Sequence, residues 1–305
     1  MSIQTLVEKI KEKGNPTVAG LDARLEYIPA YIANRNIMLH GETLRAAAES
    51  VVAFNCGLID ALCDIVPAVK PQSAYYELLG SYGAMALKET IDYAHAKGMY
   101  VIGDIKRNDI GATSTAYAQA YLGKTKVGAT EISPYNCDSV TVNGYLGTDG
   151  IVPFLEECRT YSKSIFVLVK TSNPSSGELQ NRDMEGKPLY VRMAEMVSRW
   201  GEGTETSCGY REVGAVVGAT YPEEQKTVRE ILPNSYFLIP GYGAQGASAK
   251  DIANAFNADG LGAIVNSSRG IMCAWKKTGG DGHDYKEAAR AEAIRMRDEI
   301  VTAIR

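Results

Sequence analysis

The segment Tyr-Val-Ile-Gly-Asp-Ile-Lys at residues 100–106 sets a pattern that recurs along the chain. Its apolar first part and charged end are typical of a strand that is buried on both faces and opens into a polar site. The small residues Gly111, Ala112 and Thr113 follow within a few positions. They indicate that the loop after this strand is held close to another part of the molecule.

Seven other short apolar runs share this character, and helical patterns separate them. They are TVAGLD (17–22), IVPAVK (65–70), ATEIS (129–133), IFVLVK (165–170), VGAVVGA (213–219), SYFLIP (235–240) and GAIVNSS (262–268). Strands that alternate with helices form parallel βαβ units, and eight such units close into a barrel of about 250 residues. The sequence therefore predicts an α/β fold, a (β/α)8 TIM barrel with eight parallel strands.

Two long polar segments remain once the eight units are assigned. Residues 24–43 follow the first predicted strand and residues 171–190 follow the fifth. We expect both to be loop insertions at the end of the barrel where functional loops lie. No linker or internal repeat divides the chain, so residues 1–305 are interpreted as one barrel domain. A two-domain, doubly wound fold is the structural alternative, since the length also allows two average domains.

Composition narrows the class of protein. The 32 lysines and arginines and 36 aspartates and glutamates give a net charge of −4, which excludes a bulk nucleic-acid binder. No apolar run approaches the roughly 18 residues of a membrane span, so no membrane partner is expected. Six cysteines without a CxxC pair indicate reduced thiols and a cytoplasmic location.

Charged residues end the first three predicted strands. Asp104 and Lys106 are two positions apart, so on a strand they point to the same face. Asp109 follows in the loop, while Asp22 and Lys70 close the first two strands. At the carboxyl ends of barrel strands these side chains would project into one active-site mouth. Carboxylates on both sides of Lys106 would keep its ammonium protonated, which suits a proton donor.

The last two predicted strands are followed by segments rich in glycine and serine instead of charged residues. Pro-Gly-Tyr-Gly-Ala-Gln-Gly (240–246) follows the seventh, and Asn-Ser-Ser-Arg-Gly (266–270) follows the eighth. Barrels often bind phosphate with these two loops, through backbone N–H groups, and an arginine adds a bidentate contact. We therefore expect a monophosphate site. Glycines 241, 243 and 246 also match a dinucleotide fingerprint, which keeps an NADP-dependent oxidoreductase as an alternative.

In combination, these motifs resemble those of orotidine 5′-phosphate decarboxylases. GDIKRNDIGATS (103–114) resembles the D-x-K-x-x-D signature of that family, and IPGYGAQG and NSSRGI resemble its phosphate-loop segments. VLVKTSNPSSG (167–177) and the chain length are similar to the bacterial subgroup with larger insertions. The resemblance implies decarboxylation of orotidine monophosphate to UMP, the last step of pyrimidine nucleotide synthesis, without metal or organic cofactor. It also implies a homodimer with the active sites at the interface.

The resemblance further implies a role for each matching residue. Lys106 matches the lysine that protonates the ring carbon as carbon dioxide leaves, and Asp104 matches the carboxylate set beside the substrate carboxylate. Asp109, with Thr113 near it, matches the aspartate supplied across the dimer interface. The expected substrate-binding residues are Asp22 and Lys70 for the ribose hydroxyls, Ser172 for the pyrimidine, and Gln245, Arg269, Gly243 and Ser268 for the phosphate.

Two other functions fit the same motifs. One is a magnesium-dependent lyase or decarboxylase that acts on a sugar phosphate, and the other is a non-catalytic nucleotide-binding barrel. Taken alone, the D-x-K-x-x-D match also fits a solvated surface turn. His40, His95 and His283 have no partner at metal-ligand spacing, so no metal site is expected.

Overall fold

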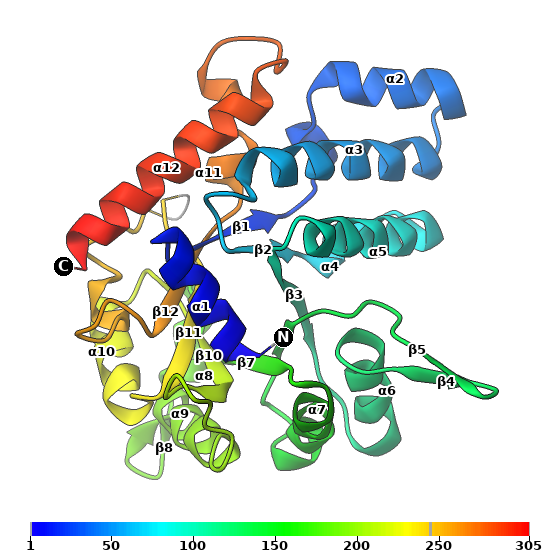
Figure 1. Cartoon of the computed structure of the whole chain (residues 1–305). Coiled ribbons are helices and arrows are strands. Elements are labelled where there is room, and N and C mark those ends of the chain that lie inside the picture. Colours follow the sequence, from blue (N-terminus) through cyan, green and yellow to red (C-terminus); the bar gives the residue numbers. More distant parts are fainter. Residues whose placement is uncertain (1, 244–245, 305) are drawn as a thin grey trace.

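The computed structural model, which describes residues 2–243 and 246–304, contains a closed barrel of eight strands (Figure 1). The barrel strands are β1 (Thr17–Leu21), β2 (Ala68–Pro71), β3 (Tyr100–Arg107), β6 (Ser139–Val142), β7 (Ser164–Lys170), β10 (Arg211–Val217), β11 (Ser235–Ile239) and β12 (Ala263–Ser267). They pair in this order, all in parallel, and β12 pairs with β1 to close the ring. The predicted fold class is confirmed.

Helices surround this barrel. They are α1 (Ile3–Lys13), α2 (Ala30–His40), α3 (Leu44–Leu62), α4 (Ser73–Glu77), α5 (Gly80–Ala96), α6 (Gly111–Tyr121), α7 (Thr148–Tyr161), α8 (Gly177–Gln180), α9 (Leu189–Trp200), α10 (Pro222–Ile231), α11 (Arg269–Met272) and α12 (Tyr285–Ala303), with 3-10 turns at Leu25–Tyr27, Pro174–Ser176, Ala253–Ala255 and Ala274–Lys277. Figure 1 shows α2 beside α3, on which it packs. Within residues 2–243 and 246–304, no helix combines the length and apolar character needed to cross a membrane.

The fourth barrel strand corrects the sequence prediction. Residues 129–133 are predicted to be a barrel strand, but β5 (Thr130–Ile132) pairs with β4 (Thr125–Val127) in an exposed antiparallel hairpin. The barrel instead uses β6, whose sequence Ser-Val-Thr-Val alternates polar and apolar residues. The prediction is wrong because Ala-Thr-Glu-Ile-Ser and Ser-Val-Thr-Val both mix polar and apolar residues, so the local pattern does not show which of the two is buried. A buried barrel strand can carry polar side chains when other groups satisfy their hydrogen bonds.

Residues 24–43 follow β1 and residues 171–190 follow β7, and neither segment is an open loop. Residues 24–43 fold mainly as α2, where the Asn36 side chain donates a hydrogen bond to Ser50 of α3 at 3.1 Å. Residues 171–190 contain a 3-10 turn, α8 and a small hairpin of β8 (Asp183–Met184) and β9 (Lys187–Pro188). Both segments therefore carry their own short elements.

Strand alternation divides the buried residues into an outer core under the helices and an inner core inside the barrel. The inner core contains Ala68, Tyr100 and Phe166 from the strands, together with the apolar face of α1. Since Leu6 and Ile10 of α1 belong to this cluster, the helix seals the amino end of the barrel. The carboxyl end of the barrel is not covered by α1, and it is the end at which barrels of this kind carry their active sites.

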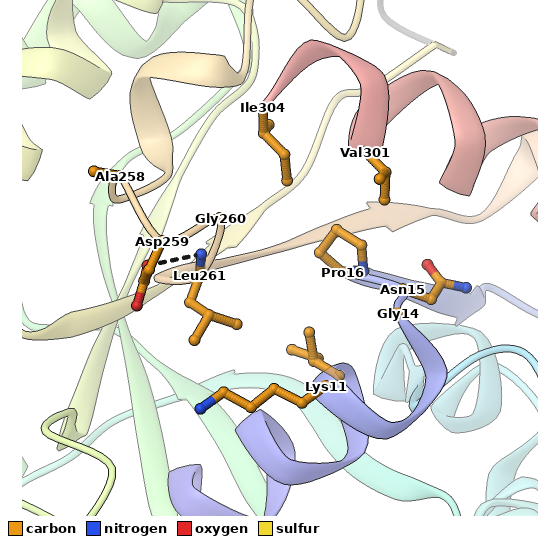
Figure 2. A pocket seen from close by; sticks show the side chains of 11 residues that line it. Lys11, Gly14, Asn15, Pro16, Ala258, Asp259, Gly260, Leu261, Val301 and Ile304 are labelled. Atoms are coloured by element: carbon orange, nitrogen blue, oxygen red, sulfur yellow. Dashed lines mark hydrogen bonds between the residues drawn. The ribbon is translucent and has the colours of Figure 1, made fainter.

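A cavity of about 440 Å³ lies at the sealed end, between α1 and α12 (Figure 2). Its lining is mostly apolar, with Lys11 and Asp259 as the charged side chains. The Asp259 carboxylate accepts a hydrogen bond from the Leu261 amide at 3.0 Å. None of the expected site residues that the structure describes lines this cavity.

A partly buried carboxyl group holds the first turn of α1. The Ile3 amide donates a hydrogen bond of 2.9 Å to Glu212, the second residue of β10. Burial raises the pKa of Glu212 from its ordinary 4.5 to about 7, against the opposing effect of the Ile3 hydrogen bond. The folded protein therefore keeps a proton on Glu212 at a pH where the unfolded chain releases it.

We expect the free energy of unfolding to fall as pH rises from 4.5 to about 7, by up to about 3 kcal/mol from this group. Glu212→Gln removes the titrating proton and flattens this part of the profile, measured by urea unfolding at a series of pH values. Glu131→Gln, at an exposed position of β5, is the control and keeps the wild-type slope. An unchanged slope in Glu212→Gln contradicts the prediction.

Candidate active site

The charged residues that end β2 and β3 face the barrel axis. Ala68 and Tyr100 belong to the inner core. Because side chains alternate along a strand, Lys70 and Asp104 lie on the same inner face as these residues. The parallel strands place both side chains at the carboxyl end, opposite the end sealed by α1.

Two ammonium groups share the carboxylate of Asp104. Lys70 Nζ lies 2.6 Å from Asp104 Oδ2, and Lys106 Nζ lies 2.5 Å from Asp104 Oδ1. The side chains of Lys70 and Asp104 are 5% and 8% exposed, whereas that of Lys106 is 44% exposed. Asp22, the residue that follows β1, lies with Oδ1 3.9 Å from Lys70 Nζ. Lys106 is thus the accessible member of the array.

The buried Asp104 and Lys70 stay charged at neutral pH. Burial alone would raise the pKa of Asp104, but Lys70 and Lys106 hold it well below its ordinary value. Burial would likewise lower the pKa of Lys70, yet the charges of Asp104 and Asp22 raise it. Each buried charge is compensated by its neighbours, as charges of low solvent exposure require.

Gln72 and Thr141 complete this array, and neither was predicted from the sequence. Gln72 donates from Nε2 to Asp104 Oδ2 at 3.1 Å, and Thr141 donates to Asp104 Oδ1 at 2.8 Å. Gln72 lies two positions after Lys70, the same spacing that pairs Asp104 with Lys106, so its position was a usable signal. Thr141 lies on the strand that was not recognised.

The backbone at Lys106 has an unusual conformation. Its φ is +49°, a left-handed conformation that costs a non-glycine residue about 1–2 kcal/mol. The pairing of β3 with β6 shifts register between Gly103 and Arg107, and Thr141 Oγ1 accepts the Lys106 amide at 3.0 Å. The same hydroxyl therefore fixes both the carboxylate and the backbone of the accessible lysine.

A cavity of about 370 Å³ opens above the array. Its lining residues are Lys70, Asp104, Lys106, Thr141, Leu168, Thr171, Ser172, Asn173, Val216, Leu238 and Pro240. Ser172 reaches it from the segment after β7, on a different part of the rim from the charged strands. The structure thus brings the predicted Lys70, Asp104, Lys106 and Ser172 to one cavity.

Asp109 and Thr113 lie outside the array. The Asp109 carboxylate accepts the Ile110 amide at 2.8 Å, and among the described residues no ion pair joins it to Lys106. Thr113 is exposed in the first turn of α6. Within one chain, therefore, Lys106 is not bracketed by Asp104 and Asp109 as the sequence suggests. Asp104 is bracketed by Lys70 and Lys106 instead.

The expected phosphate residues follow β11 and β12. Gly243 has φ +68°, and its amide donates to the Ala247 carbonyl at 2.9 Å. Ser268 packs so closely on Gly20 of β1 that a Cβ there would lie 1.9 Å from its Oγ. Arg269 is exposed at the start of α11. Gln245 lies outside the described residues, so its position is not assigned.

The structure was also searched for side chains that could hold a metal ion. No group of three or more histidine, cysteine, aspartate or glutamate side chains is arranged to hold a metal ion in the described ranges, 2–243 and 246–304. The acidic residues of the site are separated by lysines.

The fold and the site together define a (β/α)8 barrel with a lysine–aspartate–lysine array at its carboxyl end. The chain belongs to the orotidine 5′-phosphate decarboxylase / HUMPS family, whose family model matches residues 43–278.

Several relatives match almost the whole chain. The orotidine 5′-phosphate decarboxylase of Rhodopirellula baltica is 43% identical over 295 residues, which cover 95% of this chain and 96% of that protein. The orotidine 5′-phosphate decarboxylase of Clostridium novyi is 38% identical, with 98% of each chain covered. The solved structure of Leishmania donovani OMP decarboxylase is 31% identical, with a TM-score of 0.76, and the match covers 100% of this chain and 99% of that one.

Asp104→Asn is expected to lower the free energy of unfolding at pH 7 by about 3 kcal/mol, because Lys70 would stay buried without its nearest counter-charge. The loss shrinks as pH falls below the ordinary aspartate pKa of 3.8, where the unfolded chain gains protons that folded Asp104 resists. Urea unfolding measures both effects. The matched control is Asp109→Asn, the same chemical change outside the array, and equal losses in the two variants contradict the prediction.

Proposed function

We propose that this chain decarboxylates orotidine 5′-phosphate to UMP, the last step of pyrimidine nucleotide synthesis. The observation that carries the proposal is the Lys70–Asp104–Lys106 array inside a cavity, in a chain whose close relatives bear that enzyme's name. The substrate is a small nucleotide, and the residues described above supply the groups that the reaction needs.

Lys106 is the proposed proton donor. The bond between the ring carbon and the substrate carboxylate breaks, carbon dioxide leaves, and the electron pair remains on the ring carbon. The accessible ammonium of Lys106 stabilises this charge and then protonates the carbon. The resulting amine regains a proton from solvent. Asp104 lies beside the departing carboxylate, and Lys70 keeps Asp104 ionised.

The remaining residues are proposed to bind the parts of the nucleotide that do not react. Asp22 and Lys70 hold the ribose hydroxyls, and Ser172 contacts the pyrimidine from the other side of the cavity. The proposed phosphate ligands are Gly243, Ser268 and Arg269, together with Gln245. Contacts far from the reacting carbon supply binding energy that orients the base over Lys106.

We also propose a homodimer in which Asp109 and Thr113 complete the partner's site. Leu78, Ile110 and Tyr145 are large apolar residues with 72%, 57% and 75% exposure. The segments that carry them lie together, because Arg107 pairs with Glu77 and the Asn108 side chain donates to the Asn143 carbonyl. A second copy would cover this apolar surface beside Asp109.

The remaining predictions concern organisation and location. A single domain over residues 1–305 is supported by barrel strands drawn from residues 17–267, with α1 sealing the barrel and α12 packed on α3 and β1. The prediction of a cytoplasmic location rests on six free thiols.

Lys106→Ala is expected to reduce turnover of orotidine monophosphate by about a thousandfold or more, because the proton donor is lost. UMP should still bind, which calorimetry measures, since the remaining contacts persist. Lys88→Ala, at a lysine of α5 paired with Asp92, is the control and keeps wild-type turnover.

The same spectrophotometric assay separates the alternatives. Turnover should survive a chelator, whereas the magnesium-dependent alternative requires its loss. Turnover retained in Lys106→Ala overturns the proposed role, and UMP binding by a wild-type protein without turnover favours a non-catalytic barrel.

Mixed dimers test the shared site. Lys106→Ala and Asp109→Ala protomers are each expected to be inactive alone. Random mixing should restore about one quarter of wild-type activity, because half of the dimers combine both chains and hold one intact site each. If Asp109 acts within its own chain, mixing restores nothing.

A further inference from the structure

Lys170, the last residue of β7, is a fully buried ammonium without an acidic partner among residues 2–243 and 246–304. Its Nζ donates to Asn181 Oδ1 at 2.7 Å and to Ser176 Oγ at 3.3 Å. The rings of Tyr221 and Tyr190 lie 4.4 Å and 5.7 Å from Nζ. Among the described residues, no carboxylate lies within 4.0 Å of this group. Burying a charge without an acidic partner costs free energy. The hydrogen bonds and ring contacts of Lys170 offset this cost, so they show which part of the molecule the ammonium holds in place.

Both hydrogen-bond acceptors of Lys170 belong to the segment at residues 171–188. This segment lines the active-site cavity with Thr171, Ser172 and Asn173. Its other residues are mostly exposed, and even the apolar side chains of Leu179 and Met184 are about half exposed. Apolar burial therefore contributes little to its stability, and polar contacts must fix its position.

The contacts of Lys170 continue to the residue next to Ser172. Ser176 Oγ donates to the Tyr221 hydroxyl, which donates to the Asn173 carbonyl, each at 3.3 Å. The segment also crosses the rim at Gly218, where a Cβ would lie 2.8 Å from the Ser172 backbone. The backbone at Ser172 is thus held between the rim of the barrel and a chain of hydrogen bonds that begins at the buried ammonium.

We propose that Lys170 is a positioning residue that fastens this segment to the barrel so that Ser172 faces the pyrimidine base. The inference rests on the proposed function, in which Ser172 contacts the base. Lys170 does not line the cavity, so it acts through the segment and not on the substrate. Without the ammonium, recognition of the base should weaken while the phosphate side stays intact.

Lys170→Met tests this, since methionine keeps an apolar stem of similar length without the charge. Calorimetry compares the affinity for UMP with that for ribose 5-phosphate, which lacks the base. We expect UMP to bind about tenfold more weakly, the effect of one or two lost hydrogen bonds, and ribose 5-phosphate to bind as in wild type. The KM for orotidine monophosphate should rise by a similar factor.

Two further variants keep the test decisive. Lys163→Met removes another buried lysine, just before the amino end of the same strand, and should leave the ratio of the two affinities unchanged. Asn181→Ala removes the shorter hydrogen bond from the segment side and should lower the UMP affinity alone. It replaces Lys170→Met if that variant does not fold.

An unchanged ratio of affinities in Lys170→Met, or an equal change in Lys163→Met, overturns the inference. Failure of the proposed function has a different signature. If Ser172→Ala binds UMP as wild type does, Ser172 does not contact the base, whereas the ratio in Lys170→Met still decides whether Lys170 positions the segment. If both roles hold, adding Ser172→Ala to Lys170→Met costs little further affinity.

Discussion

The buried carboxylate of Asp104 constrains the rest of the site. It remains ionised in a poorly solvated position because Lys70 and Lys106 each place an ammonium against one of its oxygens. Those contacts require β2 and β3 to be neighbours with their inner faces in register. Thr141 on β6 then fixes Asp104 and the Lys106 backbone together. Three adjacent strands thereby determine where the accessible ammonium points.

The two ends of the barrel have different roles: the amino end contributes to stability and the carboxyl end holds the candidate active site. At the amino end α1 seals an apolar interior, which stabilises the barrel without contributing to chemistry. At the carboxyl end the strands finish in charged or polar residues around one cavity. The rigid array lies on strands, whereas the proposed base contact lies on a segment held mainly by polar bonds. A buried lysine gives that segment an anchor that its small apolar content does not provide.

Most of the barrel could be predicted from sequence, because seven of its strands are continuous apolar runs and that pattern is local. The strand β6 could not, since Ser139 and Thr141 look polar until their burial inside the barrel is known. Missing β6 also concealed Thr141 as a partner of Asp104. Gln72 was missed for another reason: its spacing from Lys70 was a signal, but Asp104, the carboxylate that it meets, lies on a different strand.

By itself, the sequence determined the (β/α)8 class and the residue types at the strand ends, because burial and alternation are encoded over a few neighbouring positions. Only the tertiary structure decided which charges pair. Sequence spacing suggests that Asp104 and Asp109 enclose Lys106, yet the fold brings Lys70 from a different strand to Asp104 and leaves Asp109 outside. The interaction energy of two charges depends on the distance between them in space, not on their spacing in the sequence. In this protein the register of the parallel strands sets that distance.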